Sequence, residues 1–211
     1  MDFIDANIQA YSEAHSSPES SLLQKINRET YASVMAPRML SGHLQGRFLA
    51  MVSKMIQPSN ILEIGTYTGY SALCLAEGLK PGGKLVTIDI NEELEGRVRS
   101  YINKAGHDTS IEYHVGDAAA IIPRLDLLFN LVWIDADKVN YSNYFDLVIG
   151  KVETGGFILA DNVLWSGKVL EQAPDKDASA IQAFNKKVMD DARVENVLLP
   201  LRDGIMVMRK I

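Results

Sequence analysis

Cysteine, long apolar runs and excess positive charge are scarce or missing in this chain of 211 residues. The single cysteine, Cys74, excludes an internal disulfide and is typical of proteins from a reducing compartment. No window of about 18 apolar residues is present, so no membrane-spanning helix is expected. Residues 1–10 also lack the basic and apolar regions of a signal peptide. The sequence therefore predicts a cytoplasmic protein without membrane contacts.

Negative charge prevails, with 27 acidic against 21 basic residues and a net charge of −6. Nucleic acids and anionic lipids are bound through basic surfaces, so nucleic-acid binding is not favoured. Apolar residues make up 47% of the chain, which is enough for one sizeable core. We expect a single domain over residues 1–211, in which a helical segment (1–56) precedes an α/β core (57–211).

Apolar patterning changes its period near residue 60. Three stripes at helical spacing precede that point: Ile4, Ile8 and Tyr11; Leu22, Leu23, Ile26 and Thr30; and Phe48, Leu49, Val52, Met55 and Ile56. Strands are then predicted at 61–64, 85–88, 111–115, 131–134 and 157–160, helices at 71–79, 92–105, 144–149 and 178–188, and a closing strand pair at 194–199 and 205–208. Strands that alternate with helices indicate a parallel sheet covered on both faces, with ligands beyond the carboxyl ends of its strands.

A glycine turn, EIGTYTGYS (63–71), follows the first predicted strand. Gly65 and Gly69 permit a close approach of the backbone to a ligand. The turn lacks the third glycine and the lysine of phosphate-binding loops. Glu63 lies on the strand itself, where an unpaired carboxylate is costly. A cationic ligand therefore suits this turn better than a phosphate, and a plain strand–turn–helix corner would leave Glu63 without a purpose.

Two aspartates end the next two predicted strands. Asp89 ends the second strand, where an acid can accept both hydroxyls of a ribose; helix capping by Asp89 or Asn91 is the less favoured alternative. Asp117 ends the third strand, where it would contact an adenine amino group or cap the following helix. The sequence supports these two interpretations of Asp117 equally.

Oxygen-bearing side chains follow the fourth and fifth predicted strands, in WIDADKVNY (133–141) and at Asp161-Asn162. If the two strands are neighbours, ~4.8 Å apart, then Asp135, Asp161 and Asn162 meet at one edge and suit Mg²⁺. Helix capping explains one aspartate but not the whole set. Lys138 would have its pKa lowered by a nearby dication and would then serve as a general base. Asp137 is interpreted as a solvent-exposed loop acid.

Taken together, these stretches resemble the cation-dependent, S-adenosylmethionine-using O-methyltransferases of the caffeoyl-CoA and catechol type. The matching segments are LEIGTYTGYSAL (62–73), VTIDIN (86–91), WIDADKVNY (133–141), GGFILADNVLW (155–165), DGIMVMRK (203–210) and, upstream, MLSGHLQGRFL (39–49). The resemblance implies the class I methyltransferase fold: a Rossmann-like, seven-stranded, mostly parallel sheet with helices on both faces and an antiparallel last strand.

The resemblance also implies a role for each site residue. The cofactor-binding residues would be Met39, Ser41, Glu63, Gly65, Thr66, Tyr67, Ser71, Asp89, Asp117, Ala118 and Asp135. Among these, Glu63, Gly65 and Ser71 would hold the methionine part of S-adenosylmethionine, with Asp89 at the ribose. Asp135, Asp161 and Asn162 would hold Mg²⁺. Lys138, with Asp135, would be catalytic.

The expected reaction is methyl transfer to a hydroxyl of a catechol-like phenolic small molecule, in an enzyme that forms a homodimer through its N-terminal helices. Pro200 replaces a glutamate of the catechol-specific enzymes, so the tail LPLRDG (199–204) is more similar to the caffeoyl-CoA type. The N-terminal region, however, is shorter than in the plant enzymes and helps to receive the substrate there, so a CoA ester is not expected. The alternative is a tRNA hydroxyuridine O-methyltransferase that uses a basic patch of Lys186, Lys187 and Arg193. The complete set of expected metal-binding and catalytic residues, Asp135, Lys138, Asp161 and Asn162, argues against a cofactor-binding protein without activity.

Other polar and aromatic residues carry weaker signals. The four histidines, His15, His43, His107 and His114, share no ligand spacing, and His43 alone borders the expected mouth of the site. Trp165 would line the substrate pocket or pack in the core, with equal support. Substrate selection is assigned to the loops at 35–43 and 165–174. Cys74 is expected to be a buried, small apolar residue.

Overall fold

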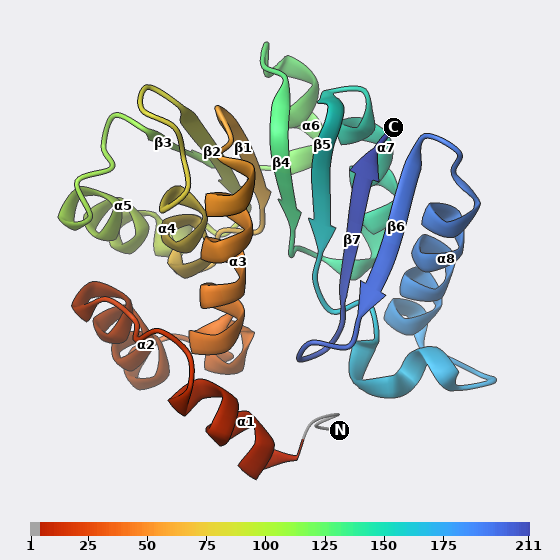
Figure 1. Cartoon of the computed structure of the whole chain (residues 1–211), viewed down its shortest axis with the longest axis horizontal. Coiled ribbons are helices and arrows are strands. Elements are labelled where there is room, and N and C mark those ends of the chain that lie inside the picture. Colours follow the sequence, from red (N-terminus) through yellow and green to blue (C-terminus); the bar gives the residue numbers. More distant parts are fainter. Residues whose placement is uncertain (1–4) are drawn as a thin grey trace.

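A seven-stranded sheet forms the centre of the computed structural model, which describes residues 5–211. The strand order is β3-β2-β1-β4-β5-β7-β6 (Figure 1). The strands are β1 (Asn60–Ile64), β2 (Lys84–Asp89), β3 (Ile111–Val115), β4 (Phe129–Ile134), β5 (Val152–Ala160), β6 (Val194–Leu199) and β7 (Ile205–Lys210). β7 runs antiparallel to both of its neighbours, β5 and β6, and all other strand pairs of the sheet are parallel. The predicted α/β class and its antiparallel last strand are confirmed.

Helices cover both faces of this sheet. One face packs against α6 (Ala118–Ile121), α7 (Tyr141–Ile149) and α8 (Lys176–Asp190). The other packs against α2 (Ser21–Ser33), α3 (Gly42–Ile56), α4 (Tyr70–Ala76) and α5 (Glu95–Lys104). The remaining elements are α1 (Ala6–Ala14) and the short 3-10 turns η1 (Pro37–Met39), η2 (Glu92–Leu94), η3 (Ile122–Arg124), η4 (Lys138–Asn140) and η5 (Trp165–Leu170). None of the described helices is long and apolar enough to cross a membrane.

The apolar stripe predicted on α3 is confirmed except at Met55. Leu49 is buried, and Phe48, Val52 and Ile56 are partly buried against the core, whereas Met55 is 71% exposed. The buried face also contains small and polar residues, Gln45, Gly46, Ala50 and Ser53. Close packing on α4 requires a small residue at Gly46, because a Cβ there would lie 2.6 Å from the Tyr70 ring. The stripe predicted on α1 is wrong, since Ile8 and Tyr11 are exposed, and Ile4 lies outside the described residues.

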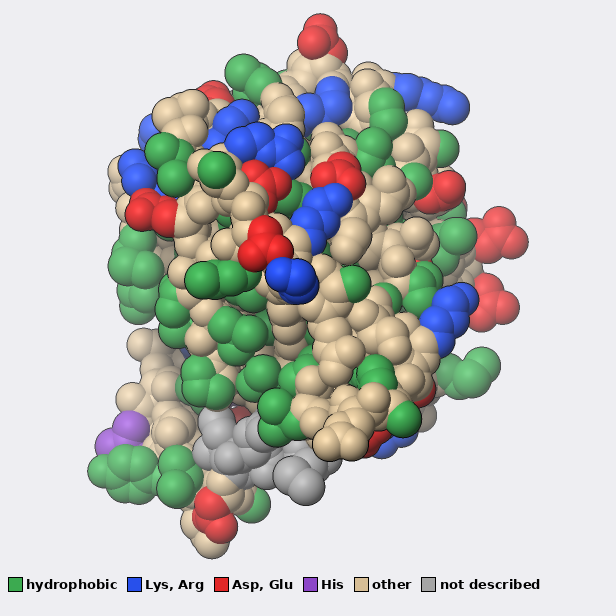
Figure 2. Space-filling model, turned by 90° about the vertical axis from the view of Figure 1, so that its right-hand side faces the viewer, with side chains coloured by type: hydrophobic (Ala, Val, Ile, Leu, Met, Phe, Trp, Pro, Cys, Tyr) green, Lys and Arg blue, Asp and Glu red, His purple; other side chains and the backbone are tan. Residues whose placement is uncertain are grey.

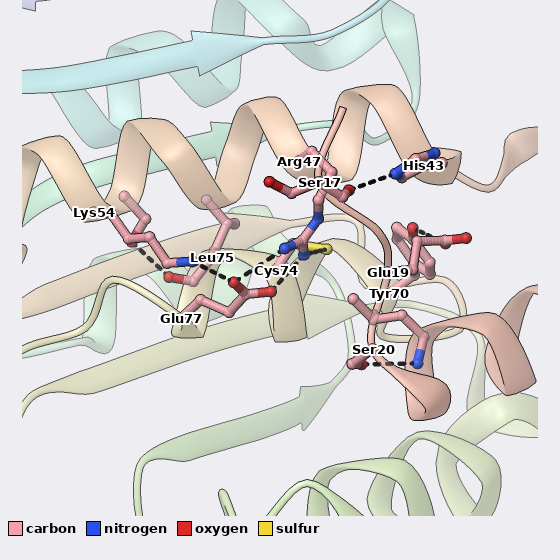
Figure 3. A network of polar contacts seen from close by, with 12 residues as sticks. Ser17, Glu19, Ser20, His43, Arg47, Lys54, Tyr70, Cys74, Leu75 and Glu77 are labelled. Carbon is pink, nitrogen blue, oxygen red and sulfur yellow. Dashed lines mark hydrogen bonds and ion pairs between the residues drawn. The ribbon is translucent and has the colours of Figure 1, made fainter. Parts of the chain in front are cut away.

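Polar contacts hold the N-terminal segment on the core (Figure 3). The Arg47 guanidinium forms an ion pair with Glu77, and its Nη2 lies 3.7 Å from the sulfur of Cys74. Lys54 contacts the same Glu77 at 2.7 Å. Cys74 is fully buried, as predicted, and burial raises the pKa of its thiol to about 12. Through these contacts α3 packs along α4, the helix that directly follows the glycine turn.

Candidate active site

Neighbouring strands bring the predicted acids together. β4 and β5 pair in parallel, with Ile134 opposite Ala160, so Asp135 and Asp161 follow at the same edge. The Asp161 backbone N–H donates to the Ile134 carbonyl at 2.9 Å, which fixes the start of the loop after β5. Strand order reverses between β1 and β4, and in open α/β sheets the ligand crevice lies at such a point.

A cavity of about 980 Å³ opens beyond these strand ends. Almost every predicted site residue lines it: Met39, Ser41, Gly65, Thr66, Tyr67, Ser71, Asp89, Asp117, Ala118, Asp135, Lys138, Asp161 and Asn162. Both predicted selectivity loops also contribute to the lining. Trp165 and Lys168 come from one, and Met35 and Arg38 from the other. The tertiary structure therefore assembles the predicted set around one space.

The glycine turn is shaped by close backbone contacts. Gly65 has φ +100°, and a Cβ at this position would lie 2.0 Å from the Asp135 carbonyl oxygen. The Tyr67 N–H donates to Asp89 Oδ2 at 2.6 Å, and the Asn91 N–H donates to Asp89 Oδ1 at 2.9 Å. The side-chain cap of the next turn is Asn91, whose oxygen accepts from Glu93 N–H. Asp89 is therefore held in the cavity wall and does not cap a helix.

Glu63 is fully buried and does not line the cavity. Its Oε2 accepts from the Thr87 hydroxyl, while Oε1 has no hydrogen-bond partner. Burial raises the pKa of this carboxyl to about 8, against the lowering effect of hydrogen bonds from Ser71 and Thr87. The predicted cofactor contact of Glu63 therefore stays a prediction, and in the ligand-free protein its carboxyl lies buried beneath the turn.

Asp117 caps the following helix, and its predicted contact with an adenine stays a prediction. Its Oδ1 accepts from the Ala119 N–H at 2.8 Å and so caps α6. The residue also lies in the cavity wall beside Ala118. The exposed Asp137, interpreted as a loop acid, accepts from the Tyr144 hydroxyl at 2.6 Å. Asp137 thus helps to hold the loop after β4.

Lys138 is not a surface lysine, since its side chain is only 10% exposed. Its ammonium donates to Asp135 Oδ1 at 3.1 Å and to the Tyr141 hydroxyl at 2.7 Å. The Lys138 nitrogen also lies 4.8 Å from the centre of the Tyr141 ring and 5.8 Å from that of Trp165. Complete burial raises the pKa of Tyr141, so this hydroxyl remains a neutral acceptor for Lys138. The Lys138 amine is thus held by Asp135 and Tyr141.

Asp161 is only 4% exposed, and its Oδ1 has no hydrogen-bond partner. Burial raises the pKa of its carboxyl to about 7, and the nearby charge of Asp135 adds to this effect. Within residues 5–211, no group of three or more His, Cys, Asp or Glu side chains is arranged to hold a metal. A cation here would depend on two carboxylates and the Asn162 amide. An unpartnered carboxylate oxygen in such an oxygen-donor set fits a hard divalent ion.

Several lining residues escaped the sequence analysis, notably Arg202 and Asp203. Asp203 Oδ1 accepts from the Ser166 N–H at 2.5 Å, which joins the closing hairpin to η5. Both residues lie in a predicted turn between strands, and although Asp203 begins the family-matching segment 203–210, no local pattern assigned a role to either residue. Conversely, His43 does not line the cavity; its Nε2 lies 2.8 Å from the Ser17 carbonyl oxygen (Figure 3).

Comparisons with known proteins agree with this geometry. A family model described as O-methyltransferase matches residues 13–211. A caffeoyl-CoA O-methyltransferase from Mesembryanthemum crystallinum is 39% identical over 183 residues, covering 79% of this chain and 71% of the relative. Among solved structures, a Bacillus cereus O-methyltransferase in complex with SAH superposes with a TM-score of 0.89 at 29% identity, covering 97% of both chains. A Streptomyces achromogenes O-methyltransferase in complex with SAM gives 0.88 at 27% identity, covering 97% and 96%. The chain therefore belongs to the O-methyltransferase family.

Proposed function

We propose that this protein transfers the methyl group of S-adenosylmethionine to one hydroxyl of a small phenolic molecule with two neighbouring hydroxyls, with the help of Mg²⁺. One observation carries the proposal. Asp135, Asp161, Asn162 and Lys138 line the same cavity as the glycine turn. A methyl donor held by the turn and an acceptor held by the acids would therefore meet within one space.

The cofactor half of the cavity suits a sulfonium ion. Asp89, Asp117 and Asp135 line the same cavity as the turn, and a positively charged ligand gains from these carboxylates. We assign the ribose to Asp89 and the adenine to the wall at Asp117 and Ala118. The structural relatives in complex with SAM and SAH support this choice of cofactor.

The acceptor half would hold a divalent cation through Asp135, Asp161 and Asn162. A bound cation supplies Lewis-acid polarisation of a hydroxyl, which lowers the pKa of that hydroxyl. Lys138 removes the hydroxyl proton, for which its amine must first be in the neutral form. The oxygen then forms a bond to the methyl carbon as the carbon–sulfur bond breaks, leaving a neutral thioether. Alignment of the two reacting atoms accounts for much of the rate.

The test is a methylation assay with caffeic acid as the acceptor. We expect a monomethylated product by mass spectrometry in the presence of Mg²⁺, and none in excess chelator. A catechol with both hydroxyls already methylated serves as a control that offers no acceptor. Undiminished turnover in chelator would contradict the role of the cation.

The alternative substrate, a tRNA, lacks structural support. Lys186 pairs with Asp190 at 2.7 Å, Lys187 with Asp146 at 2.5 Å, and Arg193 with Asp191 at 2.6 Å. On the face that carries α8 and β6, basic and acidic side chains lie next to one another (Figure 2). The expected basic patch is therefore largely neutralised. Retardation of bulk tRNA by the protein in a low-salt gel would revive this alternative.

A further inference from the structure

Arg202 holds a segment that is distant from it in the sequence. The residue lies in the turn between β6 and β7 with φ +51°, an uncommon conformation for a residue with a side chain. Its Nη1 donates to the Leu40 carbonyl at 3.2 Å, to the Ser41 carbonyl, and to Gln45 Oε1 at 2.5 Å. No carboxylate among residues 5–211 forms an ion pair with this guanidinium. The half-buried guanidinium therefore joins the closing hairpin to the start of α3.

Tyr67, on the glycine turn, holds the other end of the same segment. Its hydroxyl donates to the Met35 carbonyl at 2.9 Å and to the Ala36 carbonyl at 3.4 Å. In the part of the chain that the structure describes, Tyr67 and Arg202 provide the only side-chain hydrogen bonds from outside to residues 35–41. We call this segment the strap. Two side chains from different elements thus hold its two ends.

The middle of the strap makes only local hydrogen bonds. The Met39 N–H donates to the Ala36 carbonyl at 2.9 Å, and the Leu40 N–H donates to the Pro37 carbonyl at 3.1 Å. Met39 is 61% exposed, whereas Leu40, next to the Arg202 contact, is buried in the core. The middle of the strap therefore depends on its two ends for its position.

The strap crosses the end of the sheet at which the predicted acids lie. Tyr67 follows β1, and Arg202 precedes β7, whose start lies beside the carboxyl end of β5. In the sheet, β4 and β5 lie between β1 and β7, so a segment held at both points passes the ends of β4 and β5. Every strap residue except Pro37 lines the cavity, together with Asp135 and Asp161. The strap is therefore one wall of the space in which the methyl donor and the acceptor would meet.

We propose that Arg202 and Tyr67 are positioning residues, which fasten the strap over the amino-acid part of the bound cofactor. The proposal rests on the proposed function, because it takes S-adenosylmethionine as the ligand. The nucleoside is assigned to Asp89 and Asp117, beyond β2 and β3, so the amino-acid part extends toward β1 and β4, where the methyl group reaches the acceptor. A strap that is in place before binding needs no further ordering, and this favours affinity.

The two contacts should act as one unit. Loss of the contact at either end frees the exposed middle of the strap, so loss of the second contact adds little. Two independent local supports would instead give additive losses. Arg202→Lys should retain part of the affinity, because a single ammonium lacks the planar set of donors with which the guanidinium reaches several oxygens.

The experiment measures ligand binding without metal or acceptor. SAH affinity is measured by calorimetry, and the SAH dissociation rate by surface plasmon resonance on immobilised protein. The variants are Tyr67→Phe, Arg202→Met, Arg202→Lys and the double variant Tyr67→Phe with Arg202→Met. Methylthioadenosine, measured by competition, is the comparison ligand, because it has the nucleoside and the thioether without the amino acid. The matched controls are Tyr11→Phe and Arg209→Met, at exposed residues outside the cavity lining.

We expect Tyr67→Phe and Arg202→Met each to weaken SAH binding by about 10-fold, mainly through faster dissociation. The double variant should lie within about two-fold of the weaker single variant. Methylthioadenosine affinity should stay at the wild-type value in all variants, which also shows that they are folded. The two controls should bind both ligands as the wild type does.

Three results would overturn the positioning role. Wild-type SAH affinity in both single variants contradicts it and leaves the proposed function intact. Additive losses in the double variant would show two separate supports, and equal losses for SAH and methylthioadenosine would show a general effect on the fold. If Arg202→Met does not fold, Tyr67→Phe and Arg202→Lys provide the same comparison. Absence of SAH binding to the wild-type protein contradicts the proposed function together with the positioning role.

Discussion

At the scale of single residues, the surroundings of a side chain decide its chemistry more than its type does. Lys138 is held between an acid and a neutral phenol, with Nζ 3.1 Å from Asp135 Oδ1 and 2.7 Å from the Tyr141 hydroxyl. Its sequence position, three residues after Asp135, indicated the first partner. The second partner, Tyr141, is the first residue of α7, which begins three residues earlier than the sequence predicted.

Replacement of Lys138 by methionine tests the proposed base. We expect kcat for methylation of caffeic acid to fall by about 10²–10⁴-fold, because the hydroxyl proton then has no acceptor in place. Binding of SAH should stay close to the wild-type value. The control is Lys186→Met on the exposed surface of α8, which should retain full turnover. Equal turnover in both variants would exclude Lys138 as the base.

Glu63 predicts how the stability of the ligand-free protein depends on pH. Its pKa is raised to about 8 by burial, from 4.5 for an exposed glutamate. Between these pH values the native state retains a proton that the unfolded state has lost, so the free energy of unfolding falls as pH rises. Glu63→Gln cannot titrate and should show a smaller fall.

Thermal unfolding at pH 5, 6, 7 and 8 measures this difference. Wild-type Tm should decrease over the range more steeply than Tm of Glu63→Gln. Glu153→Gln, at an exposed position on β5, is the control and should follow the wild-type slope. Parallel slopes for wild type and Glu63→Gln would show that Glu63 is already ionised in the native state.

At the scale of elements, the glycine turn has the least freedom to change. Gly65→Ala combines a positive φ with a Cβ that would lie 2.0 Å from the Asp135 carbonyl oxygen. We expect it to lower the free energy of unfolding by roughly 2–5 kcal/mol and to abolish SAH binding. Denaturant unfolding and calorimetry measure the two effects.

Gly96→Ala on α5 is the matched control for this variant. A Cβ at Gly96 meets no atom within 4 Å, and its φ is not positive. Alanine should therefore stabilise the helix by up to ~1 kcal/mol and leave SAH binding unchanged. Tight SAH binding by Gly65→Ala would show that the turn tolerates a side chain.

Element boundaries were predictable where apolar residues mark them and not elsewhere. The ranges predicted for β3 and β6 are confirmed. β5 begins at Val152, five residues before the predicted start, because Glu153 to Gly156 carry no apolar signal. Val152 pairs with Phe129 of β4, and an irregularity in the register separates this pair from Leu131 and Phe157. α4 ends at Ala76, before Leu79, where Gly78 packs directly on the backbone of Ser53.

At the scale of the whole molecule, exposed apolar residues favour the expected homodimer, which we retain as a proposal. Met51 and Met55 lie one turn apart on α3, and both are mostly exposed. Val197 on β6 is half exposed and pairs with Val207, on the sheet face that packs against α3. In Figure 1, α3 lies in front of the sheet, and β4 and β5 lie between it and β7 and β6. A second copy would cover this surface.

Substitution with charged residues tests the dimer. Met55→Glu combined with Val197→Glu should convert a dimer into a monomer, because two carboxylates would be buried at the interface. Light scattering after gel filtration measures the mass. Met189→Glu, an exposed methionine on α8 at the other sheet face, should leave the mass unchanged. A wild-type monomer at micromolar concentration would contradict the proposal.

The sequence by itself determined the fold class and the edge of the sheet at which the site lies. Apolar periodicity reports burial directly, and parallel strands place the residues after them, such as Asp135 and Asp161, at one edge. The tertiary structure alone decided which polar atoms meet across the chain. It buried Glu63 beneath the turn and brought Arg202 to Gln45. Such pairings depend on packing between distant segments, which no local pattern encodes.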